Sequence, residues 1–236
     1  MPAERYYLAQ SLQKGCDVSI TDQEYHHLVH VMRAAVGDTV ELVNGTGDLA
    51  TATVARLDKR QALLTIQDTA HEAPQLHAMI LAQALPRINR MDFIVEKGTE
   101  LGMTQLWLFP GEHSERKSLT DHQVDRLRAM AIAAMKQCGR LYLPEIIVKP
   151  AIKAWQPLPY PLFYGDVAPN APRLAEAWPK ETVDGAIFCI GPESGFTPAE
   201  EHALKALNAI GVSLHRNILR TDTASLVALT QLYQQL

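Results

Sequence analysis

Short apolar runs alternate with amphipathic segments from Leu76 onward, and this alternation constrains the fold more than any other feature. The apolar runs predict strands at residues 77–83, 104–109, 161–165, 185–190 and 211–214. The segments between them predict helices at residues 88–101, 121–138, 170–178, 198–209 and 222–235. Strand and helix in alternation predict an α/β fold with a parallel sheet, in which ligands bind at the carboxyl ends of strands.

The first part of the chain follows a different pattern, which predicts a small barrel or compact sheet. Strands are expected at residues 39–43, near 49–57 and at 61–67, and Asn44-Gly45 predicts a hairpin between the first two. A capping box from Thr21 to Glu24 predicts a helix over Tyr25 to Ala34. We therefore expect domains at residues 1–70 and 77–236, joined by a linker at 71–76.

Composition excludes several classes of protein. The longest apolar runs are too short to span a membrane, and the N-terminal MPAERYYLAQ lacks the features of a signal peptide. Three widely spaced cysteines favour reduced thiols, so we expect a cytoplasmic protein. The formal net charge is −4, so a nucleic-acid partner would need a local basic surface. Charge alone favours an ordinary solvated surface.

The common nucleotide and metal motifs are missing from the sequence. The only G-x-G, at Gly45, lies in a predicted hairpin and opens no helix, which argues against a Rossmann dinucleotide site. No P-loop sequence is present. His26 and His30 are one helical turn apart, but no third ligand accompanies them. We expect no metal.

Two loops between a strand and a helix are the best candidates for a site. Gly191–Phe196 follows strand 185–190, and its Thr197-Pro198-Ala199-Glu200 continuation predicts a capped helix start. Residues 217–223 lead from strand 211–214 into the last helix. In a parallel sheet both loops lie at one edge, where exposed backbone groups can bind an adenine or a carboxylate. Ordinary turn glycines explain either loop equally well.

Seven segments, in order along nearly the whole chain, resemble the RsmE family. Members of this family are 16S rRNA (uracil-N3) methyltransferases of the SPOUT superfamily. The matching segments are His26-His27-Leu28 with Val31-Met32-Arg33, then Ala84 to Arg87, Glu96 to Gly102, Ser114 to Arg116, Lys136 to Arg140, Gly191 to Phe196, and Ile218 to Ala224.

The chain departs from the family pattern at three places. Ser194 stands where the family usually has glycine, and Asp222 where it has glutamate. The family's glycine and arginine before Ile218 are replaced by the sequence Leu214-His215-Arg216-Asn217, in which Arg216 is the candidate replacement for the arginine.

The resemblance implies a fold and a set of partners. It implies a PUA-like N-terminal β-barrel for RNA and a C-terminal α/β domain tied in a trefoil knot. It also implies S-adenosylmethionine (SAM) as methyl donor, 16S rRNA near the decoding region of the small ribosomal subunit as substrate, and a homodimer with its active site at the subunit interface.

The same resemblance selects site residues. Glu193 or Asp222 is the candidate general base, and Arg220 the candidate group for stabilising charge on the uracil oxygens, unless it only pairs with Asp222. The residues expected to bind the cofactor are Tyr164, Gly165, Ile190, Gly191, Pro192, Gly195, Asn217, Ile218, Leu219, Thr221, Thr223 and Ala224. The arginines expected to bind RNA are Arg33, Arg87, Arg90, Arg116, Arg126 and Arg140.

Two other functions remain open at this point. The first is a non-enzymatic RNA-binding protein on the same fold with a decayed cofactor loop, for which the lost glycine is the best support. The second is a methyltransferase that acts on a different RNA base or on a protein.

Overall fold

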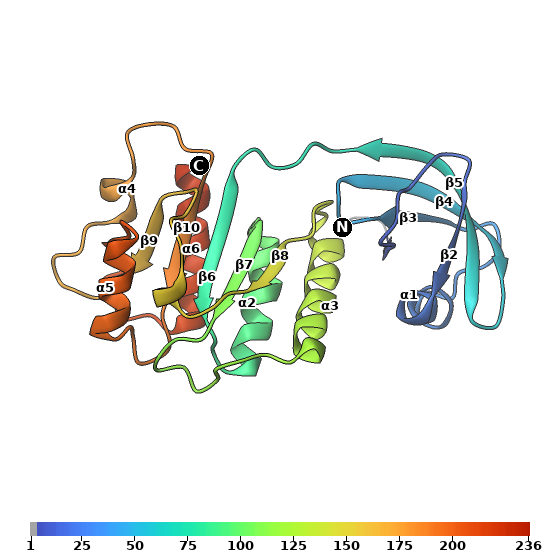
Figure 1. The fold of residues 1–236 in the computed structure, drawn as a ribbon. Helices are drawn as coiled ribbons and strands as arrows, with labels where there is room; N and C mark the ends of the chain where they lie inside the picture. Colours follow the sequence, from blue (N-terminus) through green and yellow to red (C-terminus); the bar gives the residue numbers. More distant parts are fainter. Residues whose placement is uncertain (1–3) are drawn as a thin grey trace. The chain divides into compact units, whose positions relative to one another are not determined.

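The computed structural model describes residues 4–236 and divides into two compact units (Figure 1). The first contains the chain up to Pro74 together with Ile132–Leu143, and the second contains Gln75–Ala131 together with Pro144–Leu236. The expected domain boundaries at 70 and 77 remain a prediction. The first three residues of the expected N-terminal domain lie outside the described part of the chain. The units differ from those boundaries chiefly because residues 132–143 group with the N-terminal part.

In the described residues of the first unit, one sheet has the strand order β1-β3-β4-β5-β2. The expected hairpin is confirmed: β3 and β4 pair antiparallel, and the turn between them has Gly45 at φ +75 and Gly47 at φ +102. The Asn44 side-chain oxygen accepts the amides of Thr46 at 2.9 Å and Asp48 at 3.1 Å, which closes the turn. The strands are β1 (Arg5–Tyr7), β2 (Asp17–Thr21), β3 (Thr39–Val43), β4 (Asp48–Leu57) and β5 (Gln61–His71).

The helix of this unit begins without its expected cap. Helix α1 (Asp22–His26) continues as a π-helical turn, η1 (His27–Val31), and stops short of Ala34. The Thr21 hydroxyl donates to the Asp22 carboxylate at 2.8 Å, while the Glu24 carboxylate accepts from the Lys136 ammonium at 2.6 Å. The predicted capping box is therefore wrong: the residue after Thr21, Asp22, adopts φ +53, and no side chain makes the cap hydrogen bond.

In the described part of the second unit, one parallel sheet has the order β11-β9-β10-β6-β7-β8. The expected strands are confirmed to within two residues. The short edge strand β8, flanked by Pro144 and Pro150, escaped prediction. The strands are β6 (Ala78–Ala84), β7 (Gln105–Phe109), β8 (Glu145–Val148), β9 (Leu162–Gly165), β10 (Gly185–Ile190) and β11 (Ile210–Val212).

The helices agree with the sequence where the apolar pattern is long. The helix expected at 170–178 is only four residues long, because Pro169 and Pro172 precede it. The helix expected at 198–209 ends early, where Asn208 adopts φ +59. Among residues 4–236, no helix is both long enough and apolar enough to cross a membrane. The helices are α2 (Ile88–Glu100), α3 (Asp121–Cys138), α4 (Leu174–Ala177), α5 (Pro198–Ala206) and α6 (Thr221–Gln235), with a 3-10 turn η2 (Ile152–Ala154).

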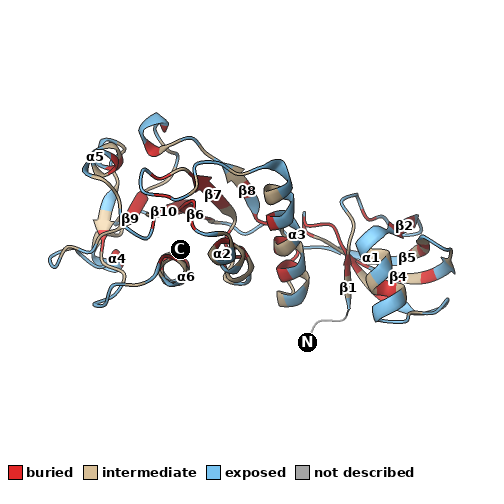
Figure 2. Cartoon of the chain, turned by 90° about the horizontal axis from the view of Figure 1, so that it is seen from below, coloured by how far each residue is buried: buried red, intermediate tan, exposed pale blue. Residues whose placement is uncertain are grey.

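Helices cover both faces of this sheet (Figure 1). On one face α5 and η2 pack over Trp107, Trp155 and Cys189. On the other face α2 and α6 pack against each other, and α6 packs against β6 and β10. Every residue of β10 is buried, as a central strand between two layers requires (Figure 2). Alternate side chains of β6 therefore face α6, and Gln83 is one of them.

The strand order creates a switch point between β6 and β10. The chain runs from β6 to β7 and β8 on one side, then crosses to β9, β10 and β11 on the other. Ligands of open α/β sheets bind at the carboxyl ends of strands at such a point. Residues 213–220 then lead from edge strand β11 back to β10 and β6, where α6 begins to pack. The trefoil knot expected in this region remains a prediction.

The close pairing of β10 with β6 depends on a glycine. A Cβ on Gly185 would lie 2.6 Å from both the Cβ and the carbonyl oxygen of Ala78. We expect Gly185→Ala to lower the free energy of unfolding by about 1–3 kcal/mol, because the overlap forces two backbones apart. Thermal unfolding measures this effect. Gly165→Ala is the matched control in the same sheet, since its nearest atoms lie at 3.8 Å. Equal melting temperatures for the two variants would contradict the prediction.

Candidate active site

The segments after β6, β7 and β10 meet at the carboxyl edge of the sheet. A Cβ built on Gly111, after β7, would lie 3.2 Å from the Ala84 Cβ and 3.4 Å from the Pro192 Cδ. The three loops therefore pack directly on one another, and the buried Ser114 lies among them.

The Glu200 carboxylate forms hydrogen bonds to two of these loops, the one after β10 and the one after β7; this contact is called the Glu200 clasp. The capping box at the start of α5 is confirmed: Glu200 accepts from the Thr197 amide at 2.9 Å, and its own amide donates to the Thr197 hydroxyl at 3.2 Å. The other oxygen of Glu200 accepts the Glu112 amide at 2.8 Å. The Thr197 hydroxyl donates to the Glu112 carboxylate at 2.8 Å. Glu200 is only 5% exposed, and the sequence predicted its role in the cap but missed its bond to the β7 loop.

Phe196 folds back over its own loop. A Cβ on Gly191 would come within 3.2 Å of the Phe196 ring, so glycine is needed for this packing, and Gly195 turns the chain at φ +80. The Phe196 ring meets Tyr164 edge-on at 6.0 Å between centroids. Burial, with a smaller effect of the nearby Asp166 carboxylate, raises the pKa of Tyr164. Its hydroxyl therefore stays neutral at physiological pH.

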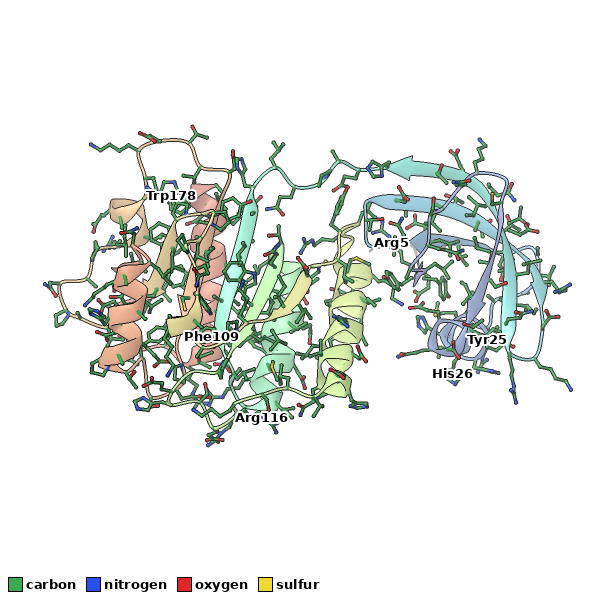
Figure 3. The ribbon with its side chains drawn as sticks, in the orientation of Figure 1. Arg5, Tyr25, His26, Phe109, Arg116 and Trp178 are labelled. Carbon is green, nitrogen blue, oxygen red and sulfur yellow. The ribbon has the colours of Figure 1, made fainter. Side chains whose placement is uncertain are left out.

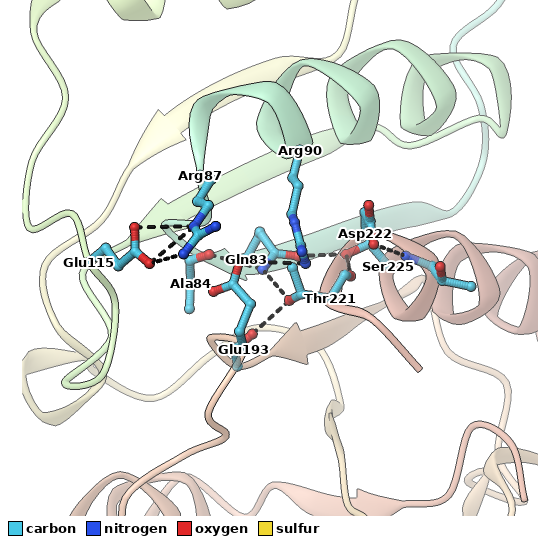
Figure 4. Close-up of polar contacts among 11 residues, drawn as sticks. Gln83, Ala84, Arg87, Arg90, Glu115, Glu193, Thr221, Asp222 and Ser225 are labelled. Atoms are coloured by element: carbon cyan, nitrogen blue, oxygen red, sulfur yellow. Dashed lines mark hydrogen bonds and ion pairs between the residues drawn. The ribbon is translucent and has the colours of Figure 1, made fainter. Parts of the chain in front are cut away.

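A chain of buried hydrogen bonds joins this loop to the first turn of α6 (Figure 4). The Thr221 hydroxyl donates to the Gly191 carbonyl at 2.9 Å. The Gln83 amide nitrogen donates to the Thr221 hydroxyl at 3.3 Å and to the Ala84 carbonyl at 2.9 Å. The Ser225 hydroxyl donates to the Gln83 carbonyl oxygen at 2.6 Å. Gln83 and Ser225 were not predicted as site residues, since a lone glutamine at a strand end carries no sequence signal.

Two ion pairs line the mouth of the site (Figure 4). Arg90, in the first turn of α2, lies 3.6 Å from the Glu193 carboxylate. Arg87 pairs with Glu115 at 2.6 Å and lowers the pKa of that carboxyl group. Two of the arginines expected to contact RNA, Arg87 and Arg90, are thus paired with carboxylates of the same chain when no RNA is bound.

Arg220 precedes the first turn of α6 and is exposed. The ion pair to Asp222 that the sequence left open does not form among the described residues; the Asp222 carboxylate instead accepts the Thr223 amide at 3.0 Å. The Arg220 side chain is therefore available to a ligand at the same edge as Glu193.

The residues expected to bind the cofactor come from three converging segments: the end of β9, the loop after β10 and the chain entering α6. In the described structure, the backbone amides of Ile218 and Leu219 make no hydrogen bond, and the Ile218 side chain is 86% exposed. Free backbone donors beside an unburied aliphatic side chain suit an adenine ring and its edge. The donor set thus fits a nucleoside cofactor such as SAM.

The chain before Ile218 closes without the family's glycine. The Asn217 amide donates to the His215 Nδ1 at 3.0 Å, so a side chain stabilises the turn. His215 and Arg216 also line a cavity of about 440 Å³ with Arg173, Ser213 and Gln231. The loop that lacks the family's glycine is therefore still closed by a hydrogen bond, from the Asn217 amide to the His215 ring.

The remaining RNA candidates are spread over both units. Arg33 and Arg140 belong to the first unit, and burial lowers the pKa of Arg140. Arg126 pairs with Asp92 within the second. Arg116 lies in the loop after β7 (Figure 3), and in the described structure it pairs with no carboxylate.

Comparisons with known proteins agree with this architecture. A family model described as an RNA methyltransferase domain matches residues 72–233, and one described as an RNA methyltransferase PUA domain matches residues 20–67. Ribosomal RNA small subunit methyltransferase E of Bacillus subtilis is 26% identical over 98% of this chain and 96% of its own. The protein of that name from Synechocystis is 28% identical over 91% of this chain and 72% of its own.

Solved structures show the same fold. Ribosomal RNA small subunit methyltransferase E from Neisseria gonorrhoeae, bound to SAM, has a TM-score of 0.87 and 26% identity, covering 99% of this chain and 98% of its own. A probable rRNA-methyltransferase from Porphyromonas gingivalis has a TM-score of 0.83 and 25% identity, covering 98% of each chain.

A PUA domain followed by a parallel sheet with its loops gathered at one switch point defines an RNA methyltransferase, and the chain belongs to that family. The relatives that match nearly its whole length are RsmE proteins, so the resemblance carried by the seven motifs is confirmed. The α/β and PUA-like fold expectations are confirmed with it, and the SAM-bound neighbour agrees with the expected cofactor.

The clasp made by Glu200 generates a prediction. Glu200→Gln replaces one acceptor with an amide donor that faces a backbone N–H. We expect a loss of roughly 1–3 kcal/mol in the free energy of unfolding. We also expect faster tryptic cleavage after Lys117, which lies in the released β7 loop. Melting curves and timed proteolysis measure both effects. Glu201→Gln, one residue along the same helix, is the control, and equal cleavage rates in the two variants would refute the clasp.

Proposed function

We propose that this chain transfers the methyl group of SAM to N3 of a uridine in 16S rRNA of the small ribosomal subunit. The observation that carries the proposal is the hydrogen bond from Thr221 to Gly191, which joins the segment of Ile218, Leu219 and Arg220 to the loop of Glu193. Both segments lie at the switch point of the sheet, and the backbone amides of Ile218 and Leu219 make no hydrogen bond in the described structure. The full-length similarity to RsmE proteins supports the base and the RNA.

The reaction requires a base beside the target nitrogen. Bound SAM supplies an electrophilic methyl group on a sulfonium. The imide proton of uracil must leave N3, because the neutral nitrogen has no free in-plane lone pair. Glu193 is the proposed base, since its side chain is 36% exposed at the mouth of the site, 3.6 Å from Arg90. Asp222 is the second candidate, and its carboxylate accepts the Thr223 amide at 3.0 Å.

Negative charge that develops on the uracil oxygens needs a cation. Arg220 is proposed for this role, since it is exposed and makes no ion pair with Asp222 in the described structure. A uridine buried in a duplex cannot reach this edge, so the substrate is an unpaired or flipped base.

The cofactor would be bound by the three converging segments. We assign adenine binding to the backbone around Ile190, Gly191, Ile218 and Leu219, and the outer wall to Tyr164, Gly165, Pro192 and Gly195. Asn217, Thr223 and Ala224 complete the set, while Thr221 acts through its bond to the Gly191 carbonyl.

The same proposal covers the partners. Arg33, Arg87, Arg90, Arg116, Arg126 and Arg140 are proposed phosphate contacts, and a cytoplasmic homodimer is the proposed working form. The rival reading, an RNA-binding protein with a decayed cofactor loop, loses its main support, because the His215 ring closes the turn that the missing glycine would have made.

Comparative mass mapping of small-subunit rRNA tests the proposal directly. Cells without the gene should lack one methyl group on one uridine near the decoding region, and the gene restored should return it. An unchanged methylation pattern would overturn the proposed function, and a methyl lost from another base or RNA would replace its substrate.

The catalytic assignments predict a separation of turnover from cofactor binding. Glu193→Gln and Arg220→Ala should each lower kcat by about 10²-fold or more, because each removes a group that acts on charge in the transition state. Calorimetry with SAM should show binding close to that of the wild type. Glu181→Gln, an exposed carboxylate outside the site, is the control. Wild-type kcat in either variant would remove its residue from the mechanism.

Phosphate contacts predict a salt dependence. The logarithm of RNA affinity should fall linearly with the logarithm of salt concentration, and Arg116→Gln should reduce the slope by about 0.7 for a single-stranded contact. Filter binding at several salt concentrations measures the slope. Arg128→Gln, which removes an exposed α3 arginine paired with Asp125, should leave it unchanged. The same slope in all three proteins would contradict a role for Arg116.

A further inference from the structure

We propose that Gln83 is a positioning residue for methyl transfer, acting through Thr221 and Ser225 to fix the cofactor loop against the start of α6. This inference rests on the proposed function, since it assigns a role within that reaction. It names two residues, Gln83 and Ser225, that neither the motifs nor the site resemblance identified.

The directions of the hydrogen bonds made by Thr221 and by the Gln83 amide nitrogen are set by their acceptors. The Gly191 and Ala84 carbonyls can only accept, so the Thr221 hydroxyl spends its proton on Gly191 and the Gln83 amide nitrogen donates to both Ala84 and Thr221. The Gln83 oxygen is left as an acceptor, and the Ser225 hydroxyl fills it at 2.6 Å. The Gln83 orientation that the Ala84 carbonyl requires also suits the Thr221 and Ser225 hydroxyls, so the arrangement is specific.

The part of the chain around Gln83 is closed to water, while the bond to Gly191 is part-buried. Gln83 and Ser225 are 0% exposed and Thr221 is 6% exposed. A buried polar group that loses its partner costs more than a typical hydrogen bond contributes, so these groups hold one another in place. An apolar side chain at position 83 would fill the same space without this constraint.

The residues that the chain holds are next to the reacting groups. Gly191 is two residues before Glu193, and Thr221 directly follows Arg220. Gln83 therefore fixes, through Thr221, the spacing between the proposed base and the proposed cation, although it touches neither. A displacement of about 1 Å in such a site can cost about 10²-fold in rate.

A purely structural role would give a different result. A polar filler between β6 and α6 would affect the melting temperature and the folded fraction, and each folded molecule would turn over normally. A positioning role lowers kcat in the folded molecules while KM for RNA and SAM affinity change little.

The test measures kcat, KM and SAM affinity per folded molecule for Gln83→Met and Ser225→Ala. We expect kcat to fall by about 10- to 100-fold in Gln83→Met and by less in Ser225→Ala. The double variant should be no slower than Gln83→Met alone, because both changes break one chain. Thr221→Ser, which keeps the hydroxyl, should restore turnover relative to Thr221→Val.

Thr230→Val is the matched control on the same helix. Its hydroxyl donates to the Leu226 carbonyl one turn back at 2.9 Å, and it is exposed and outside the chain. Thr230→Val by itself should leave kcat unchanged. Combined with Gln83→Met, it should cause no further fall in kcat. Ser225→Ala, the milder change, decides the matter if Gln83→Met does not fold.

The outcomes separate the two proposals. Wild-type kcat in folded Gln83→Met, or in folded Ser225→Ala if Gln83→Met does not fold, overturns the positioning role and leaves the proposed function standing. A wild-type protein that binds SAM and transfers no methyl group to the uridine overturns the proposed function, and the role of Gln83 in turnover with it.

Discussion

The candidate site depends on one set of hydrogen bonds, from the buried Gln83 through Thr221 to the carbonyl of Gly191. The sheet alone brings β6 and β10 together, but α6 follows the edge strand β11, on the far side of β9. The segment entering α6 must therefore be tied back to the centre of the sheet. The side chains of Gln83, Thr221 and Ser225 form this connection without a charged group. Because they are buried, one arrangement of their hydrogen bonds is favoured.

The loops at this edge are stabilised by side chains that each make two contacts. Glu200 caps α5 and also holds the β7 loop through the Glu112 amide. Phe196 covers Gly191 and also packs on Tyr164. A parallel sheet with short connections leaves many backbone donors near its carboxyl edge, and buried ones must be satisfied. The groups left free, at Ile218 and Leu219, are then the ones available to a ligand.

Capping boxes show how far local sequence can be trusted. Thr197 to Glu200 and Thr21 to Glu24 carry the same pattern, and only the first forms a cap. In the second, Asp22 adopts φ +53 directly after Thr21, and the Glu24 carboxylate pairs with Lys136, more than a hundred residues away. The helix expected at residues 170–178 shrinks to α4 for the local reason that two prolines precede it. Apolar periodicity, in contrast, placed α3 and β10 at their observed bounds.

The sequence by itself determined the parallel α/β architecture, the β-rich first part, the two loops of the candidate site and, through seven ordered motifs, the family. These follow from periodicity and turn chemistry, which are local. Only the tertiary structure decided the strand order, the pairing of Arg90 with Glu193 and the place of Gln83 beside Ser225. Such contacts join residues far apart in the chain, and a hydrogen-bond partner is set by where the backbones meet, which residue spacing does not encode.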